Sequence, residues 1–274
     1  RELGAVFVLD GPQVLPAFAP EAAVLLLRQQ GPLRISGRPV MGAPVSSAGM
    51  EEAELCRLAA CLHAGGTRTL GLGMSLGDLC MDEGFYPAVF AQLAAAAARL
   101  REKSGLTAKI FDLGGGFGVS CRPDCPGPDL SACAEALRAQ TCALPEALQG
   151  VQLSMSPGRF LAAGGGVLVC RVVAVKPGPT AVLDVSAAQC LRLEKRGAYH
   201  AAAALRTAGR PPLLQQLTTL EQGAPFARQV LPQLRAGDPV VIRMLGADGR
   251  SFSCASERCP AYLLRADGTI EPIE

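Results

Sequence analysis

The feature that most constrains the fold of this chain is an alternation, through its first 165 residues, of short apolar runs with longer segments of helical spacing. The short runs close at Gly or Pro, as strands do, whereas the longer segments place apolar residues on one face at the helical period. The runs that we interpret as strands are 5–10, 23–28, 69–74, 108–113 and 151–155. The segments that we interpret as helices are 51–63, 86–103 and 130–140. Continuous apolar strands separated by helices favour a parallel sheet covered by helices, so residues 1–165 are predicted to form a partial TIM-like parallel β/α barrel.

Beyond residue 165 the pattern changes to strands that are joined by short turns. Strands are predicted at 167–175, 180–185, 239–244 and 261–265. Successive strands without intervening helices are typical of antiparallel sheets. The predicted fold class is therefore α/β, with the partial barrel at 1–165 followed by a mainly antiparallel C-terminal β-domain at 166–274.

Composition excludes several classes of partner. The 274 residues carry a formal net charge of +2, which is too small to attract nucleic acid or an anionic membrane. Trp is absent and aromatic residues make up 4%, which argues against base stacking. The apolar runs are far shorter than the roughly 20 residues that cross a bilayer. We therefore expect no nucleic-acid and no membrane partner and, because no signal pattern follows the initial Arg1, a cytoplasmic protein with further sequence upstream.

The eleven cysteines lack the spacing of a metal site. A zinc knuckle separates its two cysteines by two residues, whereas the close pairs here are separated by three or four. These pairs are Cys56 with Cys61, Cys121 with Cys125, and Cys254 with Cys259. The two histidines are far apart, so we expect no metal and a reduced, intracellular protein.

Three consecutive glycines form the motif with the clearest chemistry. They lie in Asp112-Leu113-Gly114-Gly115-Gly116-Phe117-Gly118, directly after a predicted strand. Glycine lets the backbone approach an anion closely and point several N–H groups at it. A plain tight turn would use the same residues, so the motif alone leaves both interpretations open.

A second motif, Ser156-Pro157-Gly158-Arg159, follows the next predicted strand about 40 residues later. Arginine offers a planar fork for phosphate oxygens, although a turn with a surface arginine would look the same. The carboxyl ends of successive parallel strands meet at one edge of the sheet, which is where barrel enzymes bind phosphate. The two motifs together predict an anion site at Gly114, Gly115, Gly116 and Arg159.

The pair DLGGGFG and SPGRFLAAGGGVLVCRVVAVK resembles the paired motifs of the pyridoxal-phosphate-dependent ornithine/diaminopimelate/arginine decarboxylases, which have an alanine-racemase-like barrel (fold type III). Ala198-Tyr199-His200 and Ala236-Gly237-Asp238 resemble further segments of that family. The resemblance implies pyridoxal 5'-phosphate (PLP) as cofactor, with its phosphate at the four residues named above. It also implies an eight-stranded barrel, of which the five predicted strands are the last five. We expect the open edge to be covered by a helix, by further chain or by a partner subunit.

The chain departs from the family pattern at the residues that carry the chemistry. The family's cofactor-binding lysine lies on a strand before these five, and none of Lys103, Lys109, Lys176 and Lys195 has its expected context. The glutamate that faces the pyridine nitrogen is replaced by Ser156, and the histidine that stacks on the ring by Ser75. The other replacements are Asp78 for a phosphate-binding Ser, Leu220 for the catalytic Cys, Ala224 for a substrate-binding Asp and Asp248 for a Tyr.

Three hypotheses follow from these departures. We favour a catalytically impaired relative of the basic amino-acid decarboxylases, with no catalytic residue assigned. It would act as a regulatory or structural partner, as a homodimer or as a heterodimer with a related decarboxylase subunit, and would take an amino acid as a further ligand. The alternative is a fragment of an active PLP-dependent decarboxylase of polyamine or lysine biosynthesis. The third is a barrel that binds PLP or phosphate without decarboxylation.

Overall fold

The structure is a computed structural model, and the chain divides in it into two compact units. It describes residues 5–12, 20–28, 33–35, 38–39, 48–75, 80–120, 122, 125–186, 189, 199–221, 226, 228–247 and 259–273. The first unit comprises Arg1–Val119 and Gly127–Gly158, and the second comprises Ser120–Pro126 and Arg159–Glu274. The domain ranges expected from the sequence, 1–165 and 166–274, stay a prediction.

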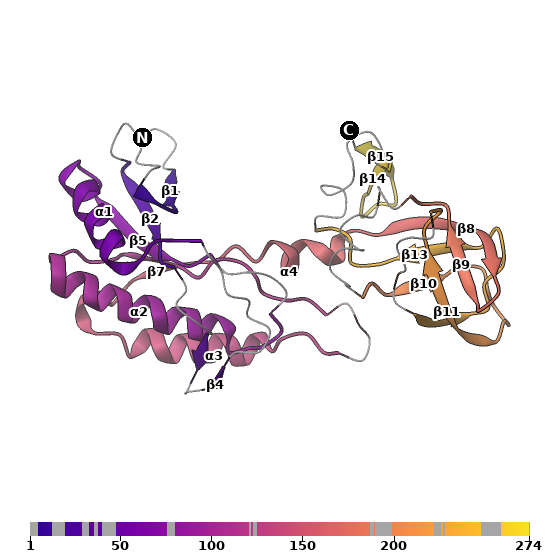
Figure 1. The fold of residues 1–274 in the computed structure, drawn as a ribbon, viewed down its shortest axis with the longest axis horizontal. Coiled ribbons are helices and arrows are strands. Elements are labelled where there is room, and N and C mark those ends of the chain that lie inside the picture. Colours follow the sequence, from indigo (N-terminus) through magenta and orange to yellow (C-terminus); the bar gives the residue numbers. More distant parts are fainter. Residues whose placement is uncertain are drawn as a thin grey trace. The chain divides into compact units, whose positions relative to one another are not determined.

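The first unit is built on a parallel sheet of five strands (Figure 1). In spatial order these are β1 (Val6–Leu9), β2 (Ala22–Leu26), β5 (Thr69–Gly73), β6 (Ile110–Asp112) and β7 (Gln152–Ser154). Every neighbouring pair is parallel, including β5 with β6. All but the first residue of β2 and of β5 are buried, which explains why their sequences are continuously apolar rather than alternating. The predicted parallel sheet is confirmed.

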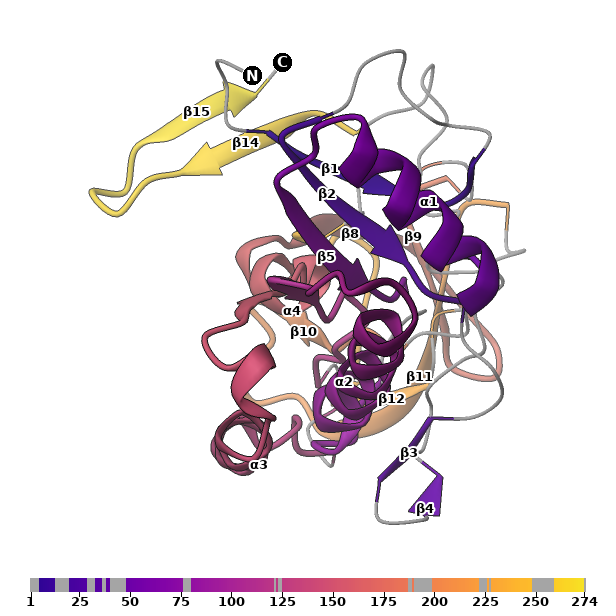
Figure 2. The same cartoon turned by 90° about the vertical axis from the view of Figure 1, so that its left-hand side faces the viewer.

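Three long helices alternate with these strands, as predicted. They are α1 (Glu52–Ala64), α2 (Phe85–Ser104) and α3 (Leu130–Cys142). Helix α1 packs against β2, as Figure 2 shows, while α2 packs against β5 and α3 against α2. Helix α3 begins at Asp129, whose carboxylate accepts hydrogen bonds from the N–H groups of Ser131 and Ala132.

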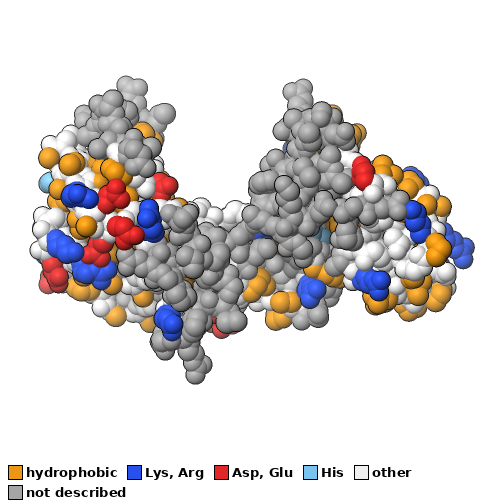
Figure 3. All heavy atoms as spheres, viewed as in Figure 1, with side chains coloured by type: hydrophobic (Ala, Val, Ile, Leu, Met, Phe, Trp, Pro, Cys, Tyr) orange, Lys and Arg blue, Asp and Glu red, His pale blue; other side chains and the backbone are white. Residues whose placement is uncertain are grey.

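Aromatic side chains fill the core of the first unit between α2 and the sheet. Phe90 on α2 meets Phe111 on β6 edge-on, with ring centroids 5.6 Å apart, and both are fully buried. On the surface, Glu52 of α1 forms ion pairs with Arg99 and Lys103 of α2 at 2.7 and 2.8 Å. In Figure 3, side chains of both charges accordingly lie intermingled on this unit.

Short strands and helical turns occur in the first unit and at the start of the second. The segments are β3 (Arg34–Ile35), β4 (Arg38–Pro39), the 3-10 turns η2 (Glu146–Leu148) and η3 (Ala163–Gly165), and α4 (Gly158–Ala162). β3 and β4 pair with each other as a small antiparallel ribbon. None of these was expected from the sequence, because each is too short to show a period.

The second unit is a mixed sheet of six strands. In spatial order they are β10 (Ala202–Ala204), β13 (Pro239–Ile242), β8 (Leu168–Lys176), β9 (Thr180–Leu183), β11 (Pro212–Thr218) and β12 (Gln229–Pro232). Four of the neighbouring pairs are antiparallel, and β9 with β11 is parallel. The expected mainly antiparallel β-domain is confirmed. Its core includes Val172, Leu183, Leu217 and Val240.

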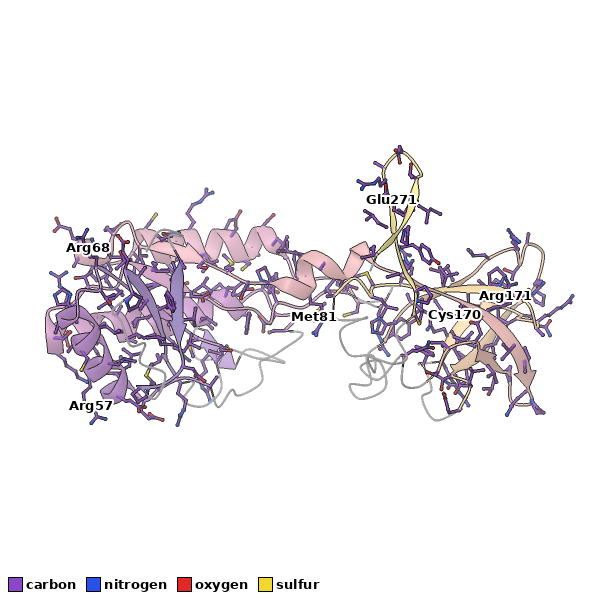
Figure 4. All side chains as sticks on the ribbon, turned by 90° about the horizontal axis from the view of Figure 1, so that it is seen from above. Arg57, Arg68, Met81, Cys170, Arg171 and Glu271 are labelled. Carbon is purple, nitrogen blue, oxygen red and sulfur yellow. The ribbon has the colours of Figure 1, made fainter. Side chains whose placement is uncertain are left out.

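A separate two-stranded hairpin belongs to the second unit. It consists of β14 (Ala261–Leu264) and β15 (Ile270–Ile273) and is closed near its turn by the ion pair of Arg265 with Glu271 at 2.7 Å. Figure 4, where Glu271 is labelled, shows it projecting from this unit. In the part of the chain that the structure describes, no helix is both long and apolar enough to cross a membrane.

Candidate functional site

The predicted anion site lies at the carboxyl edge of the parallel sheet, in the turn that follows β6. Asp112 ends the strand, and its Oδ1 accepts a hydrogen bond from the Gly114 N–H at 3.0 Å. Gly114 and Gly116 have φ values of 69° and 89°, in the left-handed region that glycine adopts without strain. The turn therefore folds back immediately after the strand, and the backbone of the triplet lies at the sheet edge.

Close approach of the neighbouring strand ends accounts for two of the three glycines. A Cβ on Gly114 would overlap the carbonyl oxygen of Met74, which follows β5, and a Cβ on Gly115 would lie 2.8 Å from the carbonyl oxygen of Ser156, which follows β7. Gly118 is restricted in the same way, because its Cβ would lie 2.7 Å from the carbonyl oxygen of Cys80, next to Met81, which is labelled in Figure 4. Packing of backbone against backbone thus requires glycine here whether or not a ligand binds.

Hydrogen bonds to the strands on either side fix the turn in place. The Met74 N–H donates to the Asp112 carbonyl at 3.1 Å, and the Leu113 N–H donates to the Ser154 carbonyl at 2.8 Å. The Gly114 carbonyl accepts from the Ser156 N–H at 2.9 Å, and the Gly116 carbonyl accepts from the Cys80 N–H at 2.9 Å.

Two backbone N–H donors of the turn take no part in this hydrogen-bond network. Within the described residues, the N–H groups of Gly115 and Gly116 have no hydrogen-bond acceptor. Successive backbone N–H groups in a tight turn form an anion-binding concavity. The arrangement can therefore hold an oxyanion without any change in the protein's own hydrogen bonds.

Two serine hydroxyls flank the turn. Ser156 Oγ lies 3.6 Å from the position that a Cβ on Gly115 would occupy, and the Cα of Ser75 lies 3.9 Å from the equivalent position on Gly114. Both serines are exposed, and neither hydroxyl has a hydrogen-bond partner among the described residues. Asp78, the third departure expected at this edge, lies outside those residues.

Tyr86 was not singled out from the sequence, although its side chain lies beneath the turn. Its ring is 3% exposed and packs on that of Phe117 with centroids 5.0 Å apart. Its hydroxyl has no hydrogen-bond partner among the described residues. Burial, with smaller contributions from Cys133, Asp112 and Cys80, raises the pKa of Tyr86 well above its usual range, so this hydroxyl stays protonated. A tyrosine at the start of an apolar helix gives no sequence signal for this placement.

The two described lysines of the first unit lie away from the carboxyl edge of its sheet. Lys103 is in the last turn of α2 and pairs with Glu52, and Lys109 directly precedes β6, so both are at the amino edge. Lys176 ends β8 in the second unit. Lys195 lies outside the described residues.

Several predicted site residues belong to the second unit. Arg159 is half-buried in α4, and the structure assigns it to this unit, whereas the three glycines belong to the first. Leu220 is 49% exposed, as an apolar side chain with no acid–base chemistry. Ala224 and Asp248 lie outside the described residues.

The Tyr199-His200 pair serves the packing of the second unit. The Tyr199 hydroxyl donates to Gln229 Oε1 at 3.2 Å, and His200 Nδ1 lies 3.1 Å from the Arg243 carbonyl oxygen. Burial lowers the pKa of His200, which keeps its ring neutral at pH 7. Among the residues for which the structure gives positions, no group of three or more His, Cys, Asp or Glu could hold a metal ion.

The fold and the turn together define a class of protein: a β/α-barrel module with a phosphate-type glycine turn at the carboxyl edge of its sheet, followed by a β-domain. Residues 48–163 match the family described as pyridoxal-dependent decarboxylase, pyridoxal binding domain. The chain is a relative of the PLP-dependent decarboxylases of fold type III, of the diaminopimelate type.

Curated relatives extend the match beyond this region. Diaminopimelate decarboxylase of Campylobacter jejuni is 34% identical over 172 residues, which are 59% of this chain and 41% of the relative. Protein TabA of Pseudomonas amygdali pv. tabaci is 30% identical over 235 residues, 82% of this chain and 55% of TabA. The chain thus spans about half the length of these relatives.

Solved structures show the same fold. The crystal structure of Helicobacter pylori diaminopimelate decarboxylase complexed with L-lysine has a TM-score of 0.74 at 19% identity, covering 91% of this chain and 63% of that one. Lysine/ornithine decarboxylase of Vibrio vulnificus complexed with cadaverine has a TM-score of 0.71 at 20% identity, covering 91% and 66%.

Proposed function

We propose that this chain binds the phosphate of PLP at the turn after β6 and does not decarboxylate amino acids itself. It acts as a non-catalytic partner of a related decarboxylase subunit. The observation that carries this proposal is the combination of two unused N–H groups, on Gly115 and Gly116, with a sheet edge from which both described lysines of the first unit, Lys103 and Lys109, lie away. When bound, PLP supplies an electron sink for a substrate carbon.

The residues fit the phosphate end of the cofactor better than its reacting end. The turn offers backbone donors, and the described carboxylate at the turn, that of Asp112, is engaged by the Gly114 N–H. At the reacting end, Ser156 and Ser75 supply neutral hydroxyls, which do not add the charge that a carboxylate or an imidazole would supply. That Arg159 also contacts the phosphate rests on the family resemblance and stays a prediction.

The second candidate function is that of a fragment of an active PLP-dependent decarboxylase. Such an enzyme would act on a basic amino acid in lysine or polyamine biosynthesis. The length of the curated relatives favours this function, because they contain residues that this chain does not span. In that case a lysine outside the present 274 residues would carry the cofactor. Two structural neighbours are complexed with L-lysine and with cadaverine, which supports a basic amino-acid ligand for either function.

One experiment separates the two functions. The purified chain is incubated with PLP, reduced with borohydride and examined by mass spectrometry, while carbon dioxide release is measured from labelled ornithine, lysine and diaminopimelate. We expect phosphate and PLP to bind reversibly, with no lysine adduct and no release above the PLP-only blank. A reduced PLP–lysine adduct together with substrate-dependent release would establish an active enzyme instead.

A further inference from the structure

A short stretch of the chain leaves the first unit soon after the glycine turn and then comes back to it. The first unit ends at Val119 and resumes at Gly127, and the residues between them, 120–126, belong to the second unit. We call these residues the strap. The strap begins two residues after Gly118, so a contact that holds it also holds the chain that leaves the glycine turn. Its described residues are Ser120, Arg122, Cys125 and Pro126.

The described residues of the strap make their hydrogen bonds within the strap. The Ser120 hydroxyl bonds to the carbonyl oxygens of Arg122, at 2.9 Å, and of Cys125. The Cys125 N–H donates to the Arg122 carbonyl at 3.4 Å. Between these residues and the rest of the described chain there is no hydrogen bond and no ion pair. The strap is therefore a closed turn that is held from outside by a different kind of contact.

Arg122 supplies this outside contact. Its guanidinium carbon lies over the ring of Tyr199, 4.9 Å from the ring centre, which is the geometry of a cation–π interaction. Arg122 is exposed, and both residues belong to the second unit. At an exposed site such a contact changes an equilibrium by only roughly two- to fivefold. The contact thus favours the docked strap and still breaks readily.

Tyr199 is a fixed point for this contact. Its hydroxyl donates to Oε1 of the buried Gln229 at 3.2 Å. Oε1 of Gln229 also accepts from the Ala202 N–H at 2.7 Å, while Nε2 of Gln229 donates to the His200 carbonyl at 2.8 Å. Gln229 lies on β12 and Ala202 on β10, the last and the first strand in the order of the sheet. The Tyr199 ring is therefore held by the framework of the second unit, whereas the strap depends on Arg122.

We propose that the strap is a releasable element, which the second unit holds through the contact of Arg122 with Tyr199 and which opens while both units stay folded. This inference goes beyond the proposed function, because it requires no ligand. It makes Arg122 a positioning residue, whose guanidinium fixes the strap and, through the strap, the chain that leaves the glycine turn.

Proton spectra of the full chain test the contact itself. Protons over the face of an aromatic ring are shifted upfield, so the Arg122 side-chain resonances should lie upfield of those of Arg138. Arg138 is an exposed arginine on α3 without a partner among the described residues. Tyr199→Phe keeps the ring and should retain the shift, whereas Tyr199→Leu should remove it. Arg122 resonances that coincide with those of Arg138 in wild type would overturn the proposal.

Hydrogen–deuterium exchange of the strap amides tests the opening. Arg122→Ala should raise their exchange rate roughly two- to fivefold, because the docked state loses its cation–π contact. Arg122→Lys should raise the rate less, since an ammonium group keeps a cation at the ring. Arg138→Ala is the matched control and should leave the rate unchanged. The amides of α2 and β8 should exchange as in wild type in every variant.

Each outcome of the exchange experiment decides the inference. A rise that is confined to the strap supports it. An unchanged strap rate in Arg122→Ala would overturn it, because the contact would then hold nothing in place. A rise that extends to α2 or β8 would overturn it as well, since opening would then require the unfolding of a unit.

Discussion

At the scale of single residues, Gly114 is under two constraints at once. Its φ of 69° disfavours any L side chain, and a Cβ would overlap the Met74 carbonyl oxygen on the next strand end. We expect Gly114→Ala to lower the free energy of unfolding of the first unit by about 3 kcal/mol or more, because backbone strain and a collision with main chain add.

Gly150→Ala is the control for that substitution. Gly150 has a similar φ of 74°, but nothing lies within 4 Å of its Cβ position, so only strain of about 1 kcal/mol applies. Urea unfolding of both variants measures the difference. Equal losses would mean that the strand ends do not restrict the glycine turn.

The residues around the glycine turn differ in how well the sequence predicts their positions. The three glycines were located correctly as a turn after a strand, because a Gly triplet at the end of an apolar run has few other structures. That Ser156 Oγ lies beside Gly115 depends on the pairing of β6 with β7, about 40 residues apart, and no local pattern carries it.

At the scale of elements, an ion pair joins the turn before β13 to the segment before β11. Both guanidinium NH groups of Arg210 donate to the Asp238 carboxylate, and Asp238 also accepts from the Arg235 N–H at 2.7 Å. The side chains are only 21% and 11% exposed. Asp238→Asn should therefore lower the stability of the second unit by about 2 kcal/mol at pH 7.

The pH dependence of this pair has a definite sign. The hydrogen bond from Arg210 holds the pKa of Asp238 below its ordinary value. The stabilisation is complete above the unfolded-state pKa of about 3.9 and is lost as pH falls through the lower folded-state value. The gap between wild type and Asp238→Asn in urea unfolding should thus be constant from pH 5 to 7 and narrow below about pH 4. A gap that widens on acidification would contradict this assignment.

Elements differ in how much their own sequence specifies them. The parallel strands and the three long helices were predicted to within a few residues, because strands buried on both faces are continuously apolar and helices buried on one face show the helical period. Strand β11 was missed because it contains Gln215 and Gln216. Gln215 is buried, yet its side chain bonds to the carbonyls of Leu231 and Pro232 and to the Leu234 N–H, so tertiary contacts rather than apolarity hold it there.

At the scale of the whole molecule, the first unit has an exposed apolar edge. Val6, Phe7 and Val8 of β1 are 47, 37 and 54% exposed, and within the described residues β1 pairs only with β2. Exposed apolar side chains on an edge strand favour association with another chain. We expect wild type to associate as concentration rises and Val8→Lys to reduce that association, as measured by sedimentation velocity.

Val169→Lys is the control for association through this edge. Val169 is 66% exposed, but it lies on an inner strand of its sheet, β8, between β13 and β9, and pairs with Val241 of β13. Association that persists in Val8→Lys but disappears in Val169→Lys would place the contact on the second unit instead.

The packing that requires glycine at 114 and 115 has a consequence for how such a motif is interpreted. Because the strand ends themselves exclude larger residues, the folded sheet requires glycine at both positions whether or not the protein is catalytic. Glycine at these two positions therefore indicates the architecture of the fold and does not by itself indicate an activity. No strand end restricts the side chains of Ser75 and Ser156 in this way, so these two positions can change with the function of the protein.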